Sequence, residues 1–161
     1  MVPDVTRIRG PIMPQDGQAL ADREAVSQLC KAYALAIDTR DERMLRSLFD
    51  PEAIMIGTLS KGVAKDYLGR LLEGVRGFSA TMHSILNQYI VIDGDQGHVR
   101  NYAIAYHVRR AEDGGGLMVM GIHYRDDVTR TPQGWWISGR EVVRIFDHGQ
   151  GVPPAPSQPA G

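Results

Sequence analysis

The stretch TMHSILNQYIVIDGDQGHVRNYAIAYHVRR, residues 81–110, decides the fold of this chain. It holds two runs rich in β-branched and aromatic residues on either side of GDQG, which has the composition of a tight turn. Two further runs of this kind, LMVMGIHYRDDVTR (117–130) and WWISGREVVRIF (135–146), follow the turn-like segments AEDGGG and TPQG. Strands joined by short turns predict an antiparallel meander.

The residues before this sheet have the spacing of helices. From an N-cap at Asp22 to Asp38, apolar residues recur every three or four positions and predict a helix with one buried face. Asp41 caps a short helix in ERMLRSLF (42–49), and VAKDYLGRLLEGV (63–75) predicts a third. AIMIGT (53–58) adds a short edge strand. Helices first and strands second imply an α+β domain whose sheet curls over the helices.

Composition limits the partners of the chain. It has 161 residues, 43% of them hydrophobic, and a formal charge of −1, which fits one domain with a sizeable core. The scattered basic residues predict no binding to nucleic acid or to an anionic membrane. The one cysteine, Cys30, lies among apolar residues and is expected in the core. Neither a membrane-spanning stretch nor a secretion signal is recognisable, so we expect a cytoplasmic protein.

Both ends have the composition of mobile tails. Residues 1–19 contain three prolines, and residues 148–161 end in GVPPAPSQPAG, which cannot supply a regular hydrogen-bond ladder. The folded domain is therefore expected over residues 20–147.

Alternation along residues 98–110 brings a histidine to one face of its strand. Asn101, Ala103, Ala105 and His107 share that face. The two alanines leave space beside His107, as a ligand cavity in a curved sheet requires. The alternative is a partly solvated histidine near a strand end, with no task.

Asp38 and His83 are the best clue to chemistry. One closes the predicted first helix and the other opens a long predicted strand, so a carboxylate and an imidazole stand at element ends where they can meet. A carboxylate that stabilises the protonated ring makes histidine a general base near neutral pH. Alternatively, each is a structural residue. A metal site of His83, His107 and His123 has no supporting spacing.

Taken together, several segments make the chain recognisable. Five segments resemble, in their order and spacing, the SnoaL-like branch of the nuclear-transport-factor-2-like superfamily. They are DREAVSQLCKAYALAIDTRDERMLRSLFDPEA (22–53), TMHSILNQYIVIDGD (81–95), NYAIAYH (101–107), GIHYRDDVTR (121–130) and GWWISGREVV (134–143). The resemblance covers roughly residues 20–147. It implies a cone of three helices against a curved antiparallel sheet that encloses an apolar pocket.

The resemblance also implies roles for individual residues. In the scytalone dehydratases of this superfamily, an aspartate ending the first helix and two strand histidines surround the substrate, and Asp38, His83 and His107 occupy similar places. The hexachlorocyclohexane dehydrochlorinases use an Asp/His pair with an arginine after the GxW segment, which Arg140 resembles. Their lysine on the first helix corresponds to Tyr33 here. The tyrosine beside the aspartate of the scytalone dehydratases corresponds to Ile37, and these two departures put both substrates in doubt.

We therefore expect a cofactor-independent lyase, a dehydratase or related elimination enzyme, or an isomerase, acting on a small apolar, cyclic substrate. His83 is the expected base and Asp38 its partner. His107 or a tyrosine acts on the leaving hydroxyl or on a carbonyl, and Arg140 steadies negative charge. The residues expected to bind the substrate are Tyr33, Asn101 and Tyr124.

Two alternatives of another class stay open, and neither involves turnover by this chain alone. One is a binding protein whose cavity holds a hydrophobic ligand, and the other is a small accessory subunit of an aromatic-ring dioxygenase. No metal or other cofactor is expected. Sheet faces in this superfamily commonly make dimers or trimers, so the resemblance implies a homodimer or homotrimer.

Overall fold

The structure is a computed structural model that describes residues 16–149 of the chain. Within these residues the helices are α1 (Gly17–Asp38), α2 (Glu42–Ser47) and α3 (Ala64–Arg76). The strands are β1 (Phe49–Ile56), β2 (Lys61–Val63), β3 (Ala80–Asp93), β4 (Gln96–Val108), β5 (Leu117–Thr131) and β6 (Gly134–His148). A short 3-10 helix, Ala111–Asp113, follows β4. The expected α+β class is confirmed.

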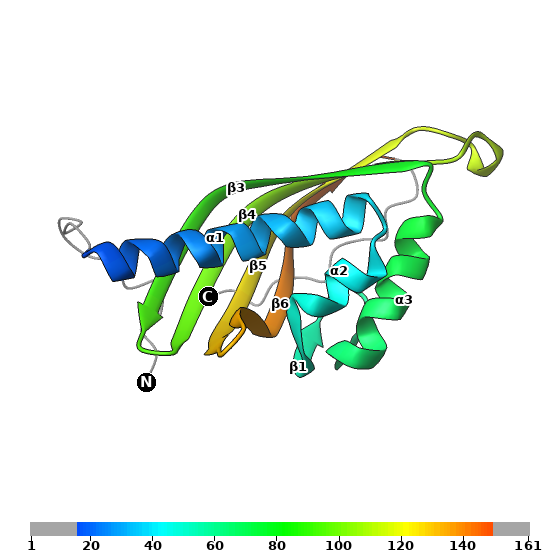
Figure 1. The fold of residues 1–161 in the computed structure, drawn as a ribbon. Coiled ribbons are helices and arrows are strands. Elements are labelled where there is room, and N and C mark those ends of the chain that lie inside the picture. Colours follow the sequence, from blue (N-terminus) through cyan, green and yellow to red (C-terminus); the bar gives the residue numbers. More distant parts are fainter. Residues whose placement is uncertain (1–15, 150–161) are drawn as a thin grey trace.

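The strands form one six-stranded sheet in the order β2-β1-β6-β5-β4-β3. The four long strands β3 to β6 pair antiparallel, which confirms the predicted meander. β1 lies inside the sheet, parallel to β6, and the unexpected strand β2 forms the edge beside it. The prediction of an edge strand at residues 53–58 was therefore wrong in position. The sheet curls so that α1 crosses its concave face, while α2 and α3 pack near β1 (Figure 1).

Helix α1 begins earlier than the sequence indicated. Asp16 is its N-cap and accepts a hydrogen bond of 2.7 Å from the backbone N–H of Ala19. Asp22 is not a cap, because its carboxylate instead pairs with Arg130 of β5 at 2.6 Å. A distant ion pair thus uses the carboxylate that local pattern assigned to capping. Residues 16–19, expected in the N-terminal tail, belong to the cap and first turn of this helix.

Helix α2 confirms its predicted cap and contradicts its predicted end. Asp41 accepts a hydrogen bond of 2.9 Å from the backbone N–H of Met44. The helix stops at Ser47, and Phe49 already belongs to β1. The backbone N–H of Ile137 in β6 donates to the carbonyl oxygen of Leu48 at 2.9 Å, so sheet pairing competes with the last helical turn and prevails.

The inner face of the sheet carries the core. Buried residues alternate along β4 as predicted, and Asn101, Ala103, Ala105 and His107 all face inward. Cys30 of α1 is also buried, and burial raises the pKa of its thiol to about 12. At that pKa the thiol stays protonated at neutral pH, as expected of a core residue rather than a nucleophile.

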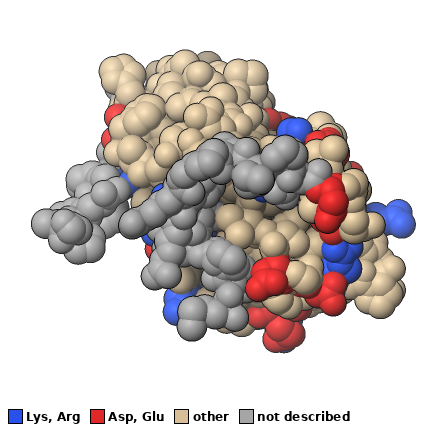
Figure 2. All heavy atoms as spheres, turned by 90° about the vertical axis from the view of Figure 1, so that its left-hand side faces the viewer, with Lys and Arg blue, Asp and Glu red and all other residues tan. Residues whose placement is uncertain are grey.

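The remaining expectations concern the two tails, membrane-spanning helices and the charge on the molecular surface. The tails expected at residues 1–15 and 150–161 lie outside the described residues, and β6 extends to His148. None of the described helices is long and apolar enough to cross a membrane. Figure 2 shows the end of the molecule on the left of Figure 1, where described acidic and basic side chains lie among a larger uncharged surface.

Candidate active site

Asp38 is placed by the way α1 ends. The chain leaves the helix through Arg40, whose φ of 58° is in the left-handed region. The backbone N–H of Arg40 donates to the carbonyl of Ile37 at 3.1 Å, and that of Asp41 donates to the carbonyl of Ala36 at 2.9 Å. This pair of bonds is a Schellman motif. It stops the helix so that Asp38 is its last residue.

Arg40 occupies a position where glycine is usual, at a cost of about 1–2 kcal/mol. Its side chain offsets part of this cost, because its guanidinium donates to the carbonyl oxygen of Phe78 at 3.0 Å. That contact ties the end of α1 to the start of β3. The strained turn therefore fixes the distance between Asp38 and the strand.

Asp38 and His83 form a close pair. His83 Nδ1 lies 2.7 Å from Asp38 Oδ1, and the backbone N–H of His83 donates to Asp38 Oδ2 at 2.8 Å. The Thr81 hydroxyl also donates to Oδ1, at 2.9 Å. Since an ionised carboxylate can only accept, a neutral His83 must carry its proton on Nδ1. Its Nε2 then has the lone pair that a general base needs.

The environment keeps Asp38 ionised. Partial burial would raise its pKa, but the hydrogen bonds from the ring and backbone of His83, with that of Thr81, outweigh burial and lower it. The side chain of His83 is only 6% exposed and that of Asp38 is 23% exposed. The pair therefore places a stable negative charge against a largely buried imidazole, and that charge can offset the positive charge that His83 gains when it takes a proton.

His107 lies beside this pair. Sheet register sets Thr81 opposite His107 and His83 opposite Ala105, so the two histidines are diagonal neighbours on the inner face. Their ring centroids are 5.4 Å apart, and the ring of Phe78 lies 4.7 Å from His107. Burial, and next the neighbouring His83, lower the pKa of His107 to about 4. The ring is therefore neutral at pH 7.

Arg140 forms a second cluster. Its Nε and Nη2 donate to the two carboxylate oxygens of Asp126 at 2.6 and 2.7 Å, and both side chains are at most 1% exposed. The guanidinium lies over the rings of Tyr33 and Tyr124, at 3.9 and 4.5 Å from their centroids. Burial alone would lower the pKa of Arg140, but Asp126 outweighs burial and raises it. The cation is permanent and already neutralised.

Asn101 links this cluster to α1. Its amide nitrogen lies 3.4 Å from Asp126 Oδ2, and its carbonyl oxygen accepts from Gln88 at 2.8 Å. Gln88 in turn accepts from Ser27 of α1 at 2.7 Å. Asn101 is 0% exposed, and this chain of hydrogen bonds satisfies polar groups that would be costly to bury unpaired.

The predicted site residues thus fall into two groups. Asp38, His83 and His107 are brought together, and so are the predicted residues Tyr33, Asn101, Tyr124 and Arg140. Within residues 16–149, no hydrogen bond or ring contact joins the groups. His123 faces the opposite side of the sheet, stacked on Tyr102 at 4.2 Å, so it cannot meet His83 and His107.

Sequence reasoning missed several residues of these clusters. Thr81 and Phe78 contact Asp38 and His107, and Asp126 neutralises Arg140. Period-two spacing from His83 was the signal for Thr81. Alternation along β5 sets Asp126 on the same face as Tyr124 and was the signal for it, whereas its pairing with Arg140 depends on the register with β6.

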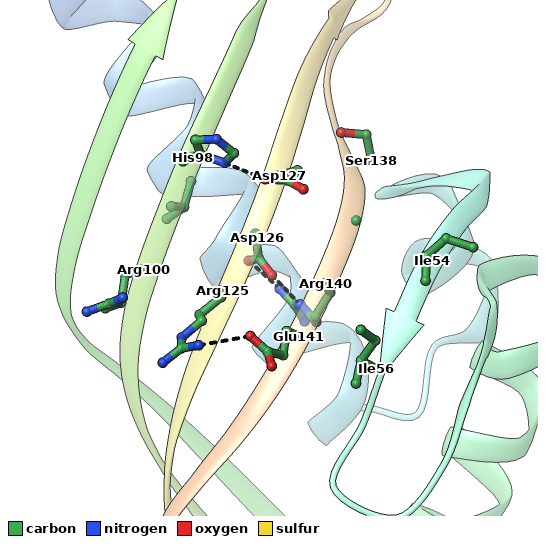
Figure 3. Close-up of a pocket in the computed structure, with 12 residues that line it drawn as sticks. Ile54, Ile56, His98, Arg100, Arg125, Asp126, Asp127, Ser138, Arg140 and Glu141 are labelled. Carbon is green, nitrogen blue, oxygen red and sulfur yellow. Dashed lines mark hydrogen bonds and ion pairs between the residues drawn. The ribbon is translucent and has the colours of Figure 1, made fainter. Parts of the chain in front are cut away.

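The groove in Figure 3 lies away from the Asp38–His83 pair. It has a volume of about 560 Å³. Arg125 and Glu141, paired at 3.0 Å, line it and alternate along their strands with inward residues, so it opens on the outer face. His98 and Asp127 also pair there, but both side chains are at least 34% exposed. Solvent weakens such a pair, so we do not regard it as a second base.

Helices packed on a curled and mostly antiparallel sheet, with an Asp/His pair on its inner face, define a nuclear-transport-factor-2-like fold. The chain belongs to the SnoaL-like domain family, whose model matches residues 18–141. The family resemblance in the sequence is thereby confirmed.

Several known proteins are similar to this chain in sequence or in structure. An uncharacterised protein of Mycobacterium tuberculosis, Rv2910c, is 31% identical over 130 residues, which is 79% of this chain and 88% of the relative. A candidate scytalone dehydratase from Novosphingobium aromaticivorans has a similar structure, with a TM-score of 0.76, 21% identity, and coverage of 85% of this chain and 93% of that chain. The hexachlorocyclohexane dehydrochlorinase LinA-type3 from Novosphingobium barchaimii is similar too, with a TM-score of 0.74 and 16% identity. The match covers 89% of this chain and 100% of that chain. At these identities the two structures show a shared fold.

Proposed function

We propose that this protein is a cofactor-independent lyase or isomerase in which His83 removes a proton from a small, largely apolar, cyclic substrate. The observation that carries the proposal is the 2.7 Å contact between Asp38 and the Nδ1 atom of His83, because it directs the basic Nε2 away from the carboxylate. The resemblance to a candidate dehydratase and a dehydrochlorinase supports the same reaction class. Dehydration and dehydrochlorination are both eliminations, and a general base that removes a proton promotes such reactions.

Asp38 makes His83 an effective base in two ways. Its lowered pKa keeps the carboxylate charged at neutral pH, and that charge stabilises the imidazolium formed when Nε2 takes the proton. Its contact with the backbone N–H of His83 also fixes the start of β3 relative to α1. The ring therefore need not reorient during proton transfer.

In this proposal His107 binds the substrate and does not act as a general acid. Its pKa of about 4 leaves it neutral at pH 7, so it orients the substrate by a hydrogen bond rather than by delivering a proton. Burial raises the pKa of Tyr33 and, more strongly, that of Tyr124, so both hydroxyls stay protonated and can donate. Arg140 orders these tyrosines, since its own charge is neutralised by Asp126.

A test does not require the natural substrate. Nitrobenzisoxazole opens when a base removes its ring proton, and it releases a coloured phenolate, so it reports a positioned base in an apolar site. We expect the protein to accelerate this reaction and the His83→Ala variant to lose the acceleration. A binding protein or an accessory subunit would give equal rates for the two. Light scattering would test the proposed homodimer or homotrimer in parallel.

A further inference from the structure

Three arginines from separate elements line one hollow at the end of the molecule where α1 and α3 end (Figure 1). Arg40 follows α1, Arg76 ends α3, and Arg110 lies in the connection between β4 and β5. The hollow has a volume of about 670 Å³. Small-molecule sites commonly have volumes of about 300–1,000 Å³, so the hollow is large enough for an organic ligand.

Two of these guanidiniums are anchored on the end of α3 and on the turn that follows it, residues 77–79. Arg40 Nη2 donates to the carbonyl oxygen of Phe78 at 3.0 Å. Arg110 Nη2 donates to the carbonyl oxygen of Arg76 at 2.7 Å. A backbone carbonyl is a neutral acceptor, so these bonds orient both cations without neutralising them. The turn therefore holds two positive charges beside the hollow.

Carboxylates compensate the three arginines unequally. The charge of Arg76 is offset by glutamates of α2 and α3. Glu112 also lines the hollow, but its Oε1 lies 3.9 Å from Arg110 Nη1, which is beyond hydrogen-bond distance. Within residues 16–149, the hydrogen bonds of the Arg40 guanidinium all go to backbone carbonyl oxygens. The hollow therefore keeps a net positive charge, which comes mainly from Arg40 and Arg110.

The backbone of Arg40 provides a second observation. Its φ of 58° lies in the left-handed region, where glycine is favoured and a residue with a side chain is strained. Strained residues of this kind cluster at ligand sites, where the surrounding contacts hold them in place. Glycine at this position would relieve the strain, but it would also remove a cation from the hollow.

We propose that this hollow binds an organic phosphate monoester. At pH 7 a phosphate monoester carries a charge of about −1.5 to −2 and presents three acceptor oxygens. Guanidiniums bind such a group through paired, charge-assisted hydrogen bonds. Arg40 and Arg110 bind the phosphate oxygens, and Phe78, which also lines the hollow, contacts the organic part of the ligand. This site goes beyond the proton transfer proposed for His83 and does not depend on it.

Three probes separate the parts of this ligand: phenyl phosphate, inorganic phosphate and benzoate. Their binding is measured by isothermal titration calorimetry above about pH 7, where the phosphate is mostly dianionic, and at constant ionic strength. Phenyl phosphate should bind about tenfold more tightly than inorganic phosphate, because its ring adds an apolar contact with Phe78. It should also bind about tenfold more tightly than benzoate, because it carries the larger charge.

Variants of the lining residues test the two cations. Arg40→Gly suits the left-handed backbone, and Arg110→Gln keeps a polar side chain at an exposed position. Each should weaken the binding of phenyl phosphate about tenfold to a hundredfold, because each removes charge-assisted hydrogen bonds. Glu112→Gln should tighten binding severalfold, because it removes the carboxylate that repels the phosphate.

Matched controls lie on the outer face of the sheet. The side chain of Arg125 is as exposed as that of Arg110, at 46% against 47%, but it is paired with Glu141. Arg125→Gln and Glu141→Gln should leave the affinity for phenyl phosphate unchanged. Equal losses in Arg110→Gln and Arg125→Gln would overturn the assignment, because they would show only a general effect of charge.

Three other results would also overturn it. They are no saturable binding of phenyl phosphate to the wild type, wild-type affinity in both Arg40→Gly and Arg110→Gln, and equal affinity for the three probes. If Arg40→Gly does not fold, Arg110→Gln and Glu112→Gln carry the test, because their effects on affinity have opposite signs.

Discussion

Asp38 binds both the ring and the backbone of His83, at 2.7 and 2.8 Å, across 45 residues of sequence. The ring contact serves proton transfer, because it orients Nε2 and stabilises the imidazolium. The backbone contact serves the fold, because it joins the end of α1 to β3. Substitutions at the two positions should therefore have separable effects.

The first prediction concerns the base. His83→Ala removes the proton acceptor and Asp38→Asn removes the charge that stabilises imidazolium, so each should lower kcat/KM on the order of 10²- to 10⁴-fold. The measurements are elimination kinetics and melting temperatures of folded variants. Near-wild-type turnover in His83→Ala would sink the proposal that it is catalytic. A merely structural pair would lose stability while activity per folded molecule survived.

The second prediction concerns Thr81. Thr81→Val keeps the shape of the side chain and removes one hydrogen bond to Asp38. We expect the pKa of Asp38 to rise and the free energy of unfolding to fall by about 1 kcal/mol. Carboxyl titration by NMR of wild type and variant would measure the shift. Unchanged titration of Asp38 would show that the Thr81 hydroxyl does not stabilise the charge. Thr129→Val is the control, because the Thr129 hydroxyl bonds polar side chains other than Asp38.

The third prediction is a pH dependence of stability that comes from His107. Its pKa is about 4 in the folded protein against 6.5 for an ordinary histidine. Between these values the unfolded chain binds more protons, so this stability is fully present above pH 6.5 and is lost as the pH falls toward 4. The slope is at most about 1.4 kcal/mol per pH unit.

Urea unfolding of the wild type and of His107→Asn at several pH values in this window would measure that contribution. The difference between the two proteins matters, because other groups titrate in both. We expect His107→Asn to be less dependent on pH than the wild type. Parallel curves of unfolding free energy against pH would contradict a buried neutral His107.

The fourth prediction compares two ion pairs between β5 and β6. Asp126→Asn leaves the buried Arg140 without its counter-ion, which should cost about 3–5 kcal/mol. Glu141→Gln breaks the exposed pair with Arg125 in the same two strands and should cost about 1 kcal/mol or less. Denaturant unfolding of both variants makes the comparison. Equal losses would mean that burial does not distinguish the two pairs.

Much of the fold follows from local pattern. The apolar spacing of α1 and the runs in β3 to β6 are encoded within each segment, because a helix or strand buries a face set by its own period. Alternation along residues 98–110 placed Asn101 and His107 on the inner face, as the structure confirms. Family resemblance added the expectation that Asp38 and His83 meet.

Pairings between distant segments were decided by tertiary structure alone. Residue patterns did not indicate that Asp22 pairs with Arg130 and does not cap the helix, or that β1 lies parallel to β6. In each case a long-range contact prevailed over a local preference.

The register of the last strand shows the reason most clearly. Strict alternation puts Arg144 and Asp147 on opposite faces, whereas a β-bulge at Ile145 puts them on one. A bulge depends on how two strands pack, here through Gly121 and Phe146, and not on the period of either strand. The sequence by itself therefore determined the elements and their buried faces. Only the tertiary structure decided which charged groups share the inner face with His83, since register is set by contacts between segments far apart in the chain.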